Sequence, residues 1–202
     1  MIAESWPAML DLRIATPPVW LDVVFSDFDA FLVDHAGCER KASATGMSFV
    51  VKYPDRSALI EPLIEFAREE LEHFHLVYKQ LVRRGLRLSD DYKDPYVNGL
   101  RGQMRGGAED LLLDRLLVAG VVEARGCERL ALVAQVLESR VPDGELLAMY
   151  RELARAESRH HALFFRLARR EFDEARVERR ADELLDFEAE LVQRLPHRPA
   201  VH

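Results

Sequence analysis

The chain has 202 residues, of which 49% are hydrophobic and 31% charged, and its formal net charge at pH 7 is −7. This size and composition are typical of one domain with a substantial core, so we expect residues 1–202 to form a single domain. The acidic balance excludes a chain that is basic throughout, but it leaves room for a local basic patch.

The sequence lacks the features of membrane and secreted proteins. No stretch approaches the roughly 18 consecutive apolar residues that a membrane helix requires. The N-terminal residues lack the basic region and the apolar stretch of a secretory signal. Cys38 and Cys127 are too few for a disulfide framework and are expected to pack as small apolar side chains. We therefore expect a cytoplasmic protein with no membrane partner.

The sequence predicts five helices after an irregular N-terminal arm over residues 1–17. Prolines and glycines bound the helices, because proline cannot continue a helix and glycine favours the conformation that ends one. The first helix has a break near Ser26, where Ser26 and Asp29 have the spacing of a capping box. The first helix runs from the arm to about residue 51, and the others span about residues 57–84, 108–139, 145–170 and 173–195.

The longest predicted connection covers residues 85–107, where turn signals such as Asp94-Pro95 recur. Short, long and short connections around four helices indicate an antiparallel bundle of two hairpins joined by a crossover. The C-terminal helix and tail, residues 171–202, lie outside this pattern. Signals for β-strands are weak, so we expect an all-α fold.

Each of the first four predicted helices has a stripe of apolar side chains along one face, which we call its seam. Ionisable side chains interrupt the seam near the middle of each helix. The interrupting residues are Glu39 in the first helix, Glu70 and His73 in the second, Glu123 in the third, and Glu157 and His160 in the fourth. In two-metal carboxylate bundles, two helices each supply one glutamate and two supply a Glu-x-x-His pair. Because an unpaired carboxylate in a dry core costs several kcal/mol, four of them with two imidazoles require cations between them.

A single Glu-x-x-His pair is weak evidence, and a third one, Glu72 with His75, falls off the seam. Two pairs on two seams, each preceded by a seam glutamate, form a specific pattern. The alternative is a bundle whose buried polar residues pair with one another, but the seams carry no basic residue to neutralise four carboxylates. Oxygen-rich ligation with one imidazole per metal favours iron or manganese. We expect two iron ions that act on dioxygen.

The ligand from the third helix is open between Glu123 and Glu128. The sequence Gly-Cys-Glu-Arg occurs at 37–40 and again at 126–129, which would equate Glu128 with Glu39. Glu123 and Glu128 are five residues apart and point about 140° away from each other, and only Glu123 lies on the seam. We choose Glu123. The residues expected to orient the ligands or to relay protons are His35, Asp34, Arg125 and Glu128.

With these residues in place, the chain resembles the MiaE family of tRNA hydroxylases, which are ferritin-like di-iron monooxygenases. The resemblance covers about residues 16–170. The most specific motif is Glu-Ala-Arg-Gly-Cys-Glu-Arg at 123–129. The other motifs that carry the resemblance lie at 20–22, 34–36, 39–42, 69–74 and 157–160.

The resemblance implies a ferritin-like four-helix bundle with a long crossover between helices two and three and an extra C-terminal helix. It implies hydroxylation of the isopentenyl group of 2-methylthio-N6-isopentenyladenosine in tRNA, with dioxygen and two electrons from a reductase or ferredoxin. The alternative is a ferritin-like protein that stores iron or detoxifies peroxide. A monomer or small oligomer would favour the enzyme, whereas a large hollow assembly would favour storage.

The basic crossover is the expected tRNA surface. Residues 79–105 carry a net positive charge on an acidic chain, and two tyrosines among them offer rings for base stacking. The alternative is a solvated loop whose arginines balance the acidic surface, and the residues alone favour that alternative. The candidate substrate-binding residues are Arg83, Arg84, Arg87, Tyr92, Tyr96, Arg101 and Arg105.

Overall fold

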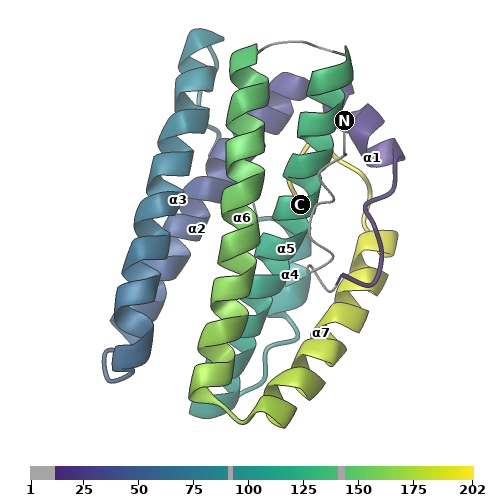
Figure 1. Cartoon of the computed structure of the whole chain (residues 1–202). Coiled ribbons are helices and arrows are strands. Elements are labelled where there is room, and N and C mark those ends of the chain that lie inside the picture. Colours follow the sequence, from purple (N-terminus) through teal and green to yellow (C-terminus); the bar gives the residue numbers. More distant parts are fainter. Residues whose placement is uncertain (1–11, 91–92, 141–143) are drawn as a thin grey trace, which may run out of the picture.

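The computed structural model describes residues 12–90, 93–140 and 144–202, and every regular element within these ranges is a helix (Figure 1). The all-α prediction is therefore confirmed. The helices are α1 (Val19–Ser26), α2 (Phe28–Lys52), α3 (Ser57–Arg83), α4 (Pro95–Arg101), α5 (Ala108–Arg140), α6 (Gly144–Glu171) and α7 (Glu174–Arg194). Within the described ranges, each helix is too short or too polar to cross a membrane.

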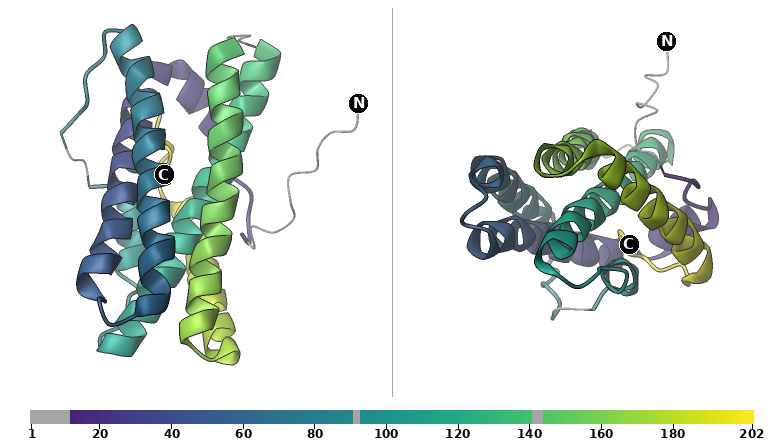
Figure 2. Two further views of the ribbon diagram at one scale, coloured as in Figure 1. Left: turned by 60° about the vertical axis from the view of Figure 1, so that its left-hand side comes forward. Right: turned by 90° about the horizontal axis from the view of Figure 1, so that it is seen from below.

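Two helical hairpins form the bundle, as the connection lengths predicted. Helix α2 packs along α3, and α5 packs along α6 (Figure 2). The two hairpins meet through α3 and α6, while α7 lies obliquely at one side of the bundle (Figure 1) and contacts α5. The crossover between α3 and α5 contains α4, which contacts both α5 and α7. Between the helices expected at 108–139 and 145–170 the sequence predicts a break over Val141-Pro142-Asp143-Gly144; its first three residues lie outside the described residues, and Gly144 is the first residue of α6.

The first predicted helix is two helices, and its capping residue differs from the prediction. The break lies at Asp27, whose φ of −146° is not helical and whose carboxylate accepts a hydrogen bond from the Ala30 amide at 3.0 Å. Aspartate is a favoured N-cap because its side chain satisfies an unpaired amide of the first turn. The Ser26 hydroxyl instead donates to the Val23 carbonyl within α1. The capping box at Ser26 and Asp29 is therefore wrong.

Helix α4 is absent from the sequence-based prediction. The Asp94-Pro95 pair predicted a turn, and it starts a helix, with Asp94 as the N-cap and Pro95 in the first turn. Proline is tolerated there because its missing amide has no helical partner in any case. Seven residues are too few to display a helical period, so only the cap could have revealed α4.

The apolar core has two parts, and the ionisable seam residues lie between them. One part includes Phe49, Leu63 and Phe164, and the other includes Leu32 and Leu137, all almost fully buried. Along each of α2, α3, α5 and α6, the ionisable seam residues lie between apolar residues of the first part and apolar residues of the second part. Burying such a side chain stabilises the fold by about 1.5–3 kcal/mol, so the two layers fix the helices on which the polar layer depends.

Candidate metal centre

Six ionisable side chains from four helices share one layer of the bundle. The structure brings together all of the residues predicted to form the centre, and their exposed fractions range from 0% for Glu70 to 9% for Glu123. They are Glu39 on α2, Glu70 and His73 on α3, Glu123 on α5, and Glu157 and His160 on α6.

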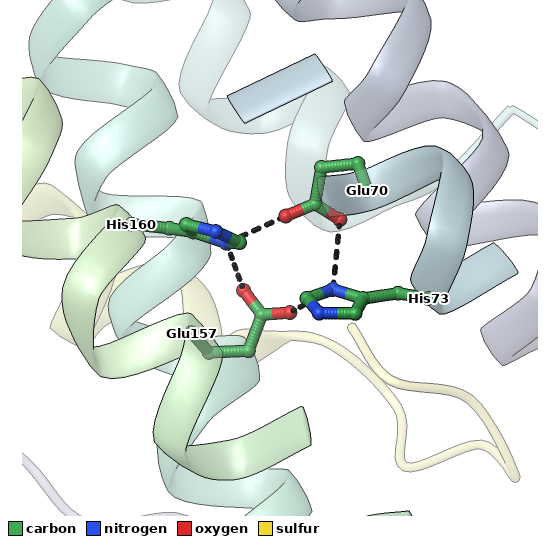
Figure 3. Close-up of side chains that lie close together, drawn as sticks. All are labelled: Glu70, His73, Glu157 and His160. Carbon is green, nitrogen blue, oxygen red and sulfur yellow. Dashed lines mark ion pairs between the residues drawn. The ribbon is translucent and has the colours of Figure 1, made fainter. Parts of the chain in front are cut away.

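Four of these side chains form a ring in which carboxylates and imidazoles alternate (Figure 3). The Nδ1 atom of His160 lies 2.6 Å from Oε1 of Glu70 and 3.5 Å from Oε2 of Glu157. The Nδ1 atom of His73 lies 3.7 Å from Oε2 of Glu70 and 3.8 Å from Oε1 of Glu157. Each carboxylate therefore faces both imidazoles. Glu39 joins the ring through its Oε2 atom, 3.8 Å from His73 Nδ1.

Several polar atoms at the middle of the ring make these ion-pair contacts but no well-formed hydrogen bond. Both carboxylate oxygens of Glu70 and the Nδ1 atoms of His73 and His160 are buried and make no hydrogen bond of good geometry. Buried polar atoms are normally hydrogen-bonded, so a group of such atoms facing one another needs an explanation. Carboxylate oxygens and imidazole nitrogens are the ligands that iron and related metals bind in proteins. The residues fit a metal centre.

The carboxylates attract positive charge to this layer. Burial and the nearby Glu70 raise the pKa of Glu39, and burial also raises the pKa of Glu70. Burial and the adjacent Glu157 raise the pKa of Glu123 well above its ordinary value. Burial alone would lower the pKa of His160, but Glu157 and Glu70 raise it to about 12. Cations between these groups would stabilise the charged carboxylates directly.

Outer contacts fix the orientation of two candidate ligands. His35 Nε2 lies 2.5 Å from Glu39 Oε1, and His35 Nδ1 lies 3.2 Å from the Tyr150 hydroxyl. His160 Nε2 lies 2.9 Å from Glu69 Oε2, so the ring presents Nδ1 to the centre. Such partners orient metal-bound side chains. Sequence reasoning found His35 but missed Tyr150 and Glu69, because no spacing rule pairs residues of different helices.

Arg125 and Glu128 were expected beside the ligands, but they contact Thr16 and Glu188 instead. The Glu128 carboxylate accepts hydrogen bonds from the Thr16 amide and hydroxyl at 2.8 and 2.7 Å and pairs with Arg125. Arg125 also donates through Nε and Nη2 to Glu188 of α7, at 2.8 and 3.0 Å. These side chains tie α5 to the arm and to α7. Their direction supports Glu123 as the α5 ligand.

Asp34, the remaining expected neighbour of the ligands, instead accepts a hydrogen bond from the Val201 amide at 2.8 Å. The C-terminal residues therefore pack against α2. Cys127 is buried and its thiol donates to the Ala154 carbonyl, which agrees with the expected packing role.

A cavity of about 630 Å³ reaches the four carboxylates from the side of α2, α4 and α5. Much of its lining is apolar and includes Phe49, Val118 and Val122. Exposed basic side chains also line it, among them Lys93 and Arg101 from the crossover and its helix α4. The arrangement can admit a largely apolar group to the layer of six ionisable residues while cations meet the polar part of the same molecule.

The basic residues expected to bind tRNA do not form one surface: one lines the cavity, and others pair with acidic side chains elsewhere. Arg101 lines the cavity, whereas Arg84 donates to Asp29 at 2.9 Å and Arg105 donates to Asp114. Of the other two predicted arginines, Arg83 forms an ion pair with Glu145, whereas Arg87 is exposed to solvent.

Of the two crossover tyrosines, Tyr92 lies outside the described residues. Tyr96 is only 1% exposed, and its hydroxyl donates to Glu188 at 2.9 Å. The prediction of Tyr96 as an exposed ring for base stacking is therefore wrong. The side chain instead fills the space between α4 and α7.

Comparisons with known proteins agree over nearly the whole chain. The family model described as tRNA-(MS[2]IO[6]A)-hydroxylase (MiaE) matches residues 6–202. A Pseudomonas putida protein named tRNA 2-(methylsulfanyl)-N(6)-isopentenyladenosine(37) hydroxylase is 35% identical over 182 residues, which cover 90% of this chain and 86% of the relative. A Salmonella typhimurium protein of the same name is 25% identical over 211 residues, covering 80% and 76%.

A solved structure shares the fold. It is described as "Protein 43 with aldehyde deformylating oxygenase activity from Synechococcus" and superposes with a TM-score of 0.86. The two chains are 32% identical, and the superposition covers 95% of this chain and 94% of the other.

Proposed function

Because the chain belongs to the MiaE family of tRNA hydroxylases, we propose that it hydroxylates the isopentenyl group of 2-methylthio-N6-isopentenyladenosine in tRNA. In this reaction one atom of dioxygen enters the substrate and the other leaves as water, with two electrons from a reductase or ferredoxin. The observation that carries the proposal is the buried ring of Glu70, His73, Glu157 and His160, in which the Glu70 oxygens and both inner imidazole nitrogens make no well-formed hydrogen bond.

We assign two iron ions to the six buried side chains. Glu70 and Glu157 each face both imidazoles, which supports a bridging role for these two carboxylates. His73 and His160 would each hold one ion through Nδ1. The terminal or additional bridging ligands would be Glu39 and Glu123. When bound, the two ions supply the redox chemistry that activates dioxygen.

The protein's own part is to position the substrate and to hold the ligands. The apolar lining of the cavity, including Phe49 and Val122, suits the isopentenyl group, and Lys93 and Arg101 suit the phosphates of the tRNA strand. His35, held by Tyr150, fixes the Glu39 carboxylate. The exposed cations Lys93 and Arg101 at the cavity wall fit a polyanionic substrate better than they fit an iron store. We further propose a monomer or small oligomer in the cytoplasm, where tRNA is modified.

Mass spectrometry of nucleosides from cells that lack the protein tests this function. We expect the hydroxylated nucleoside to disappear and 2-methylthio-N6-isopentenyladenosine to accumulate in its place. The wild-type gene should restore hydroxylation, and a gene carrying Glu70→Gln should not. Unchanged hydroxylation in the deletion strain would overturn the proposal.

A further inference from the structure

A second group of metal-ligating side chains lies in the cavity wall, outside the six-residue centre. It consists of Cys38 on α2, Asp94 at the start of α4, and His202 in the C-terminal segment. Each residue offers one ligand atom, and these atoms lie within 4.8 Å of one another. Three segments that are distant in sequence meet here, so the fold itself creates the cluster.

Two of the three separations between the ligand atoms are close to those around a single cation. His202 Nδ1 lies 3.9 Å from Cys38 Sγ and 3.6 Å from Asp94 Oδ2. Around a tetrahedral zinc ion, bonds of roughly 2.0–2.3 Å separate neighbouring ligand atoms by about 3.4–3.6 Å. The two separations from His202 Nδ1 are therefore within a few tenths of an ångström of those values, and all three atoms lie within 4.8 Å of one another.

The Asp94 side chain is 6% exposed and has one carboxylate oxygen to spare. Its Oδ1 atom caps α4 by accepting hydrogen bonds from the Tyr96 and Val97 amides at 2.8 and 3.4 Å. Its Oδ2 atom, which faces His202, is buried without a hydrogen-bond partner. The cap fixes the carboxylate, so the unpaired oxygen is held in the position that a cation would use.

The imidazole of His202 is also held in place. Its ring stacks on Tyr96, with 5.2 Å between the ring centroids and 5° between the planes. Tyr96 is in turn fixed by its hydrogen bond to Glu188. Metal sites work best when contacts of this kind orient the ligands in advance.

A Cys-His-Asp nucleophile is the main alternative, and the geometry argues against it. In such a triad, the two nitrogens of the imidazole face different partners, so that the ring can pass a proton between them. Here the Cys38 sulfur and the Asp94 oxygen both approach Nδ1 of His202. One ring nitrogen cannot serve as both ends of a relay, whereas a cation shared by all three atoms satisfies each of them.

We propose that Cys38, Asp94 and His202 bind one divalent cation of the zinc class, in addition to the two ions of the six-residue centre. One sulfur, one nitrogen and one oxygen ligand suit such a borderline metal. Three protein ligands leave a fourth position for water or for an anionic oxygen. All three residues line the cavity.

Cobalt(II) titration of the full chain tests the site, because a thiolate bound to cobalt gives a near-ultraviolet charge-transfer band that oxygen and nitrogen ligands do not give. The six-residue centre contains no cysteine, so the band reports the second site alone. We expect the band in the wild-type protein and in Cys127→Ser, the control that removes the other thiol. The band should vanish in Cys38→Ser, and cobalt should bind at least tenfold more weakly in His202→Ala.

Asp94→Asn provides a second variant that keeps the cap of α4, because asparagine also caps helices, while it removes a negative ligand. We expect the band to persist with reduced cobalt affinity. Iron content of the central site, measured on each variant, verifies the fold independently of the new site. A wild-type protein without the band, or a band that survives Cys38→Ser or is lost in Cys127→Ser alone, would overturn the proposal.

Discussion

Glu70 and Glu157 each approach both imidazoles of the central ring, at distances between 2.6 and 3.8 Å. Glu69 and Glu72 lie close to Glu70 on α3 but have different surroundings. Glu69 contacts the outer nitrogen of His160, and Glu72 is exposed to solvent. Chemical type alone therefore does not define a ligand. The direction of the side chain from its helix does.

This difference predicts the outcome of removing single carboxylates. We expect Glu157→Ala or Glu70→Ala to reduce bound iron from two ions per chain to nearly none, because either change removes a carboxylate that faces both imidazoles. Glu72→Ala is the matched control and should retain both ions. Iron analysis of the purified proteins measures the effect, and two tightly held ions in either ligand variant would refute the assignment.

The choice between Glu123 and Glu128 gives a second prediction. Glu123→Ala should lose metal and activity, because its carboxylate lies beside Glu157 in the buried layer. Glu128→Ala should keep most of its metal, since Glu128 is bound to Thr16 and Arg125. Iron content and hydroxylation should be compared in the two variants. Loss of iron in Glu128→Ala alone would show that the Gly-Cys-Glu-Arg repeat marks the ligand.

The sequence predicted the six central residues because seam position and helical period determine which side chains meet. It did not predict Tyr150 or Glu69, since their contacts depend on how α6 and α3 are rotated against their neighbours. Glu128 shows that a motif match is weaker evidence than helix geometry. Its 140° separation from Glu123 already indicated that both could not face the same layer.

At the scale of whole elements, the crossover differs most from the prediction, whereas α7 (Glu174–Arg194) lies within one residue of the expected bounds, 173–195. The long helices were predicted to within a few residues because prolines and glycines bound them. Helix α4 is too short to show a period, and α7 is held by contacts that its own sequence does not reveal. The central contact of α7 is the buried pair of Arg125 and Glu188, whose side chains are both 0% exposed.

This pair predicts a stability effect. Glu188→Ala leaves the Arg125 guanidinium buried with fewer partners, and breaking a buried pair costs about 3–5 kcal/mol of unfolding free energy. The control is Glu145→Ala, which removes the exposed partner of Arg83 and should cost about 0–1 kcal/mol. Urea denaturation measures both. Equal midpoints for the two variants would mean that the α7 contact contributes little.

The crossover predicts a graded effect on tRNA binding. Changing Lys93 and Arg101 to Glu should weaken binding at least tenfold and lower the salt slope by about 2, because both residues line the cavity. Changing Arg83 and Arg84 to Glu should weaken it less, since each already pairs with an acidic residue. Titrations at several salt concentrations measure this. A larger loss for the second pair would move the tRNA surface to the end of α3.

At the scale of the whole molecule, residues of the six-residue centre, the crossover and the C-terminal segment line one cavity. Its lining comes mainly from α2, α4 and α5, with Glu70 of α3 and Glu157 of α6, and from Val201 and His202. The sequence predicted the centre because its residues recur within single helices. The cavity could not be predicted, because its lining is assembled from segments that only the tertiary fold brings together. The tail, which carried no motif, forms part of the cavity wall.

The central claim is that the six buried residues hold the centre that transfers oxygen to tRNA. The most direct measurement supplies iron-loaded protein with a reductant, substrate tRNA and 18O-labelled dioxygen, followed by mass spectrometry of the nucleosides. We predict one 18O atom in the isopentenyl hydroxyl for the wild-type protein, and no hydroxylated product for Glu157→Ala. A hydroxyl whose oxygen comes from water, or product formation by Glu157→Ala at the wild-type rate, would contradict the claim.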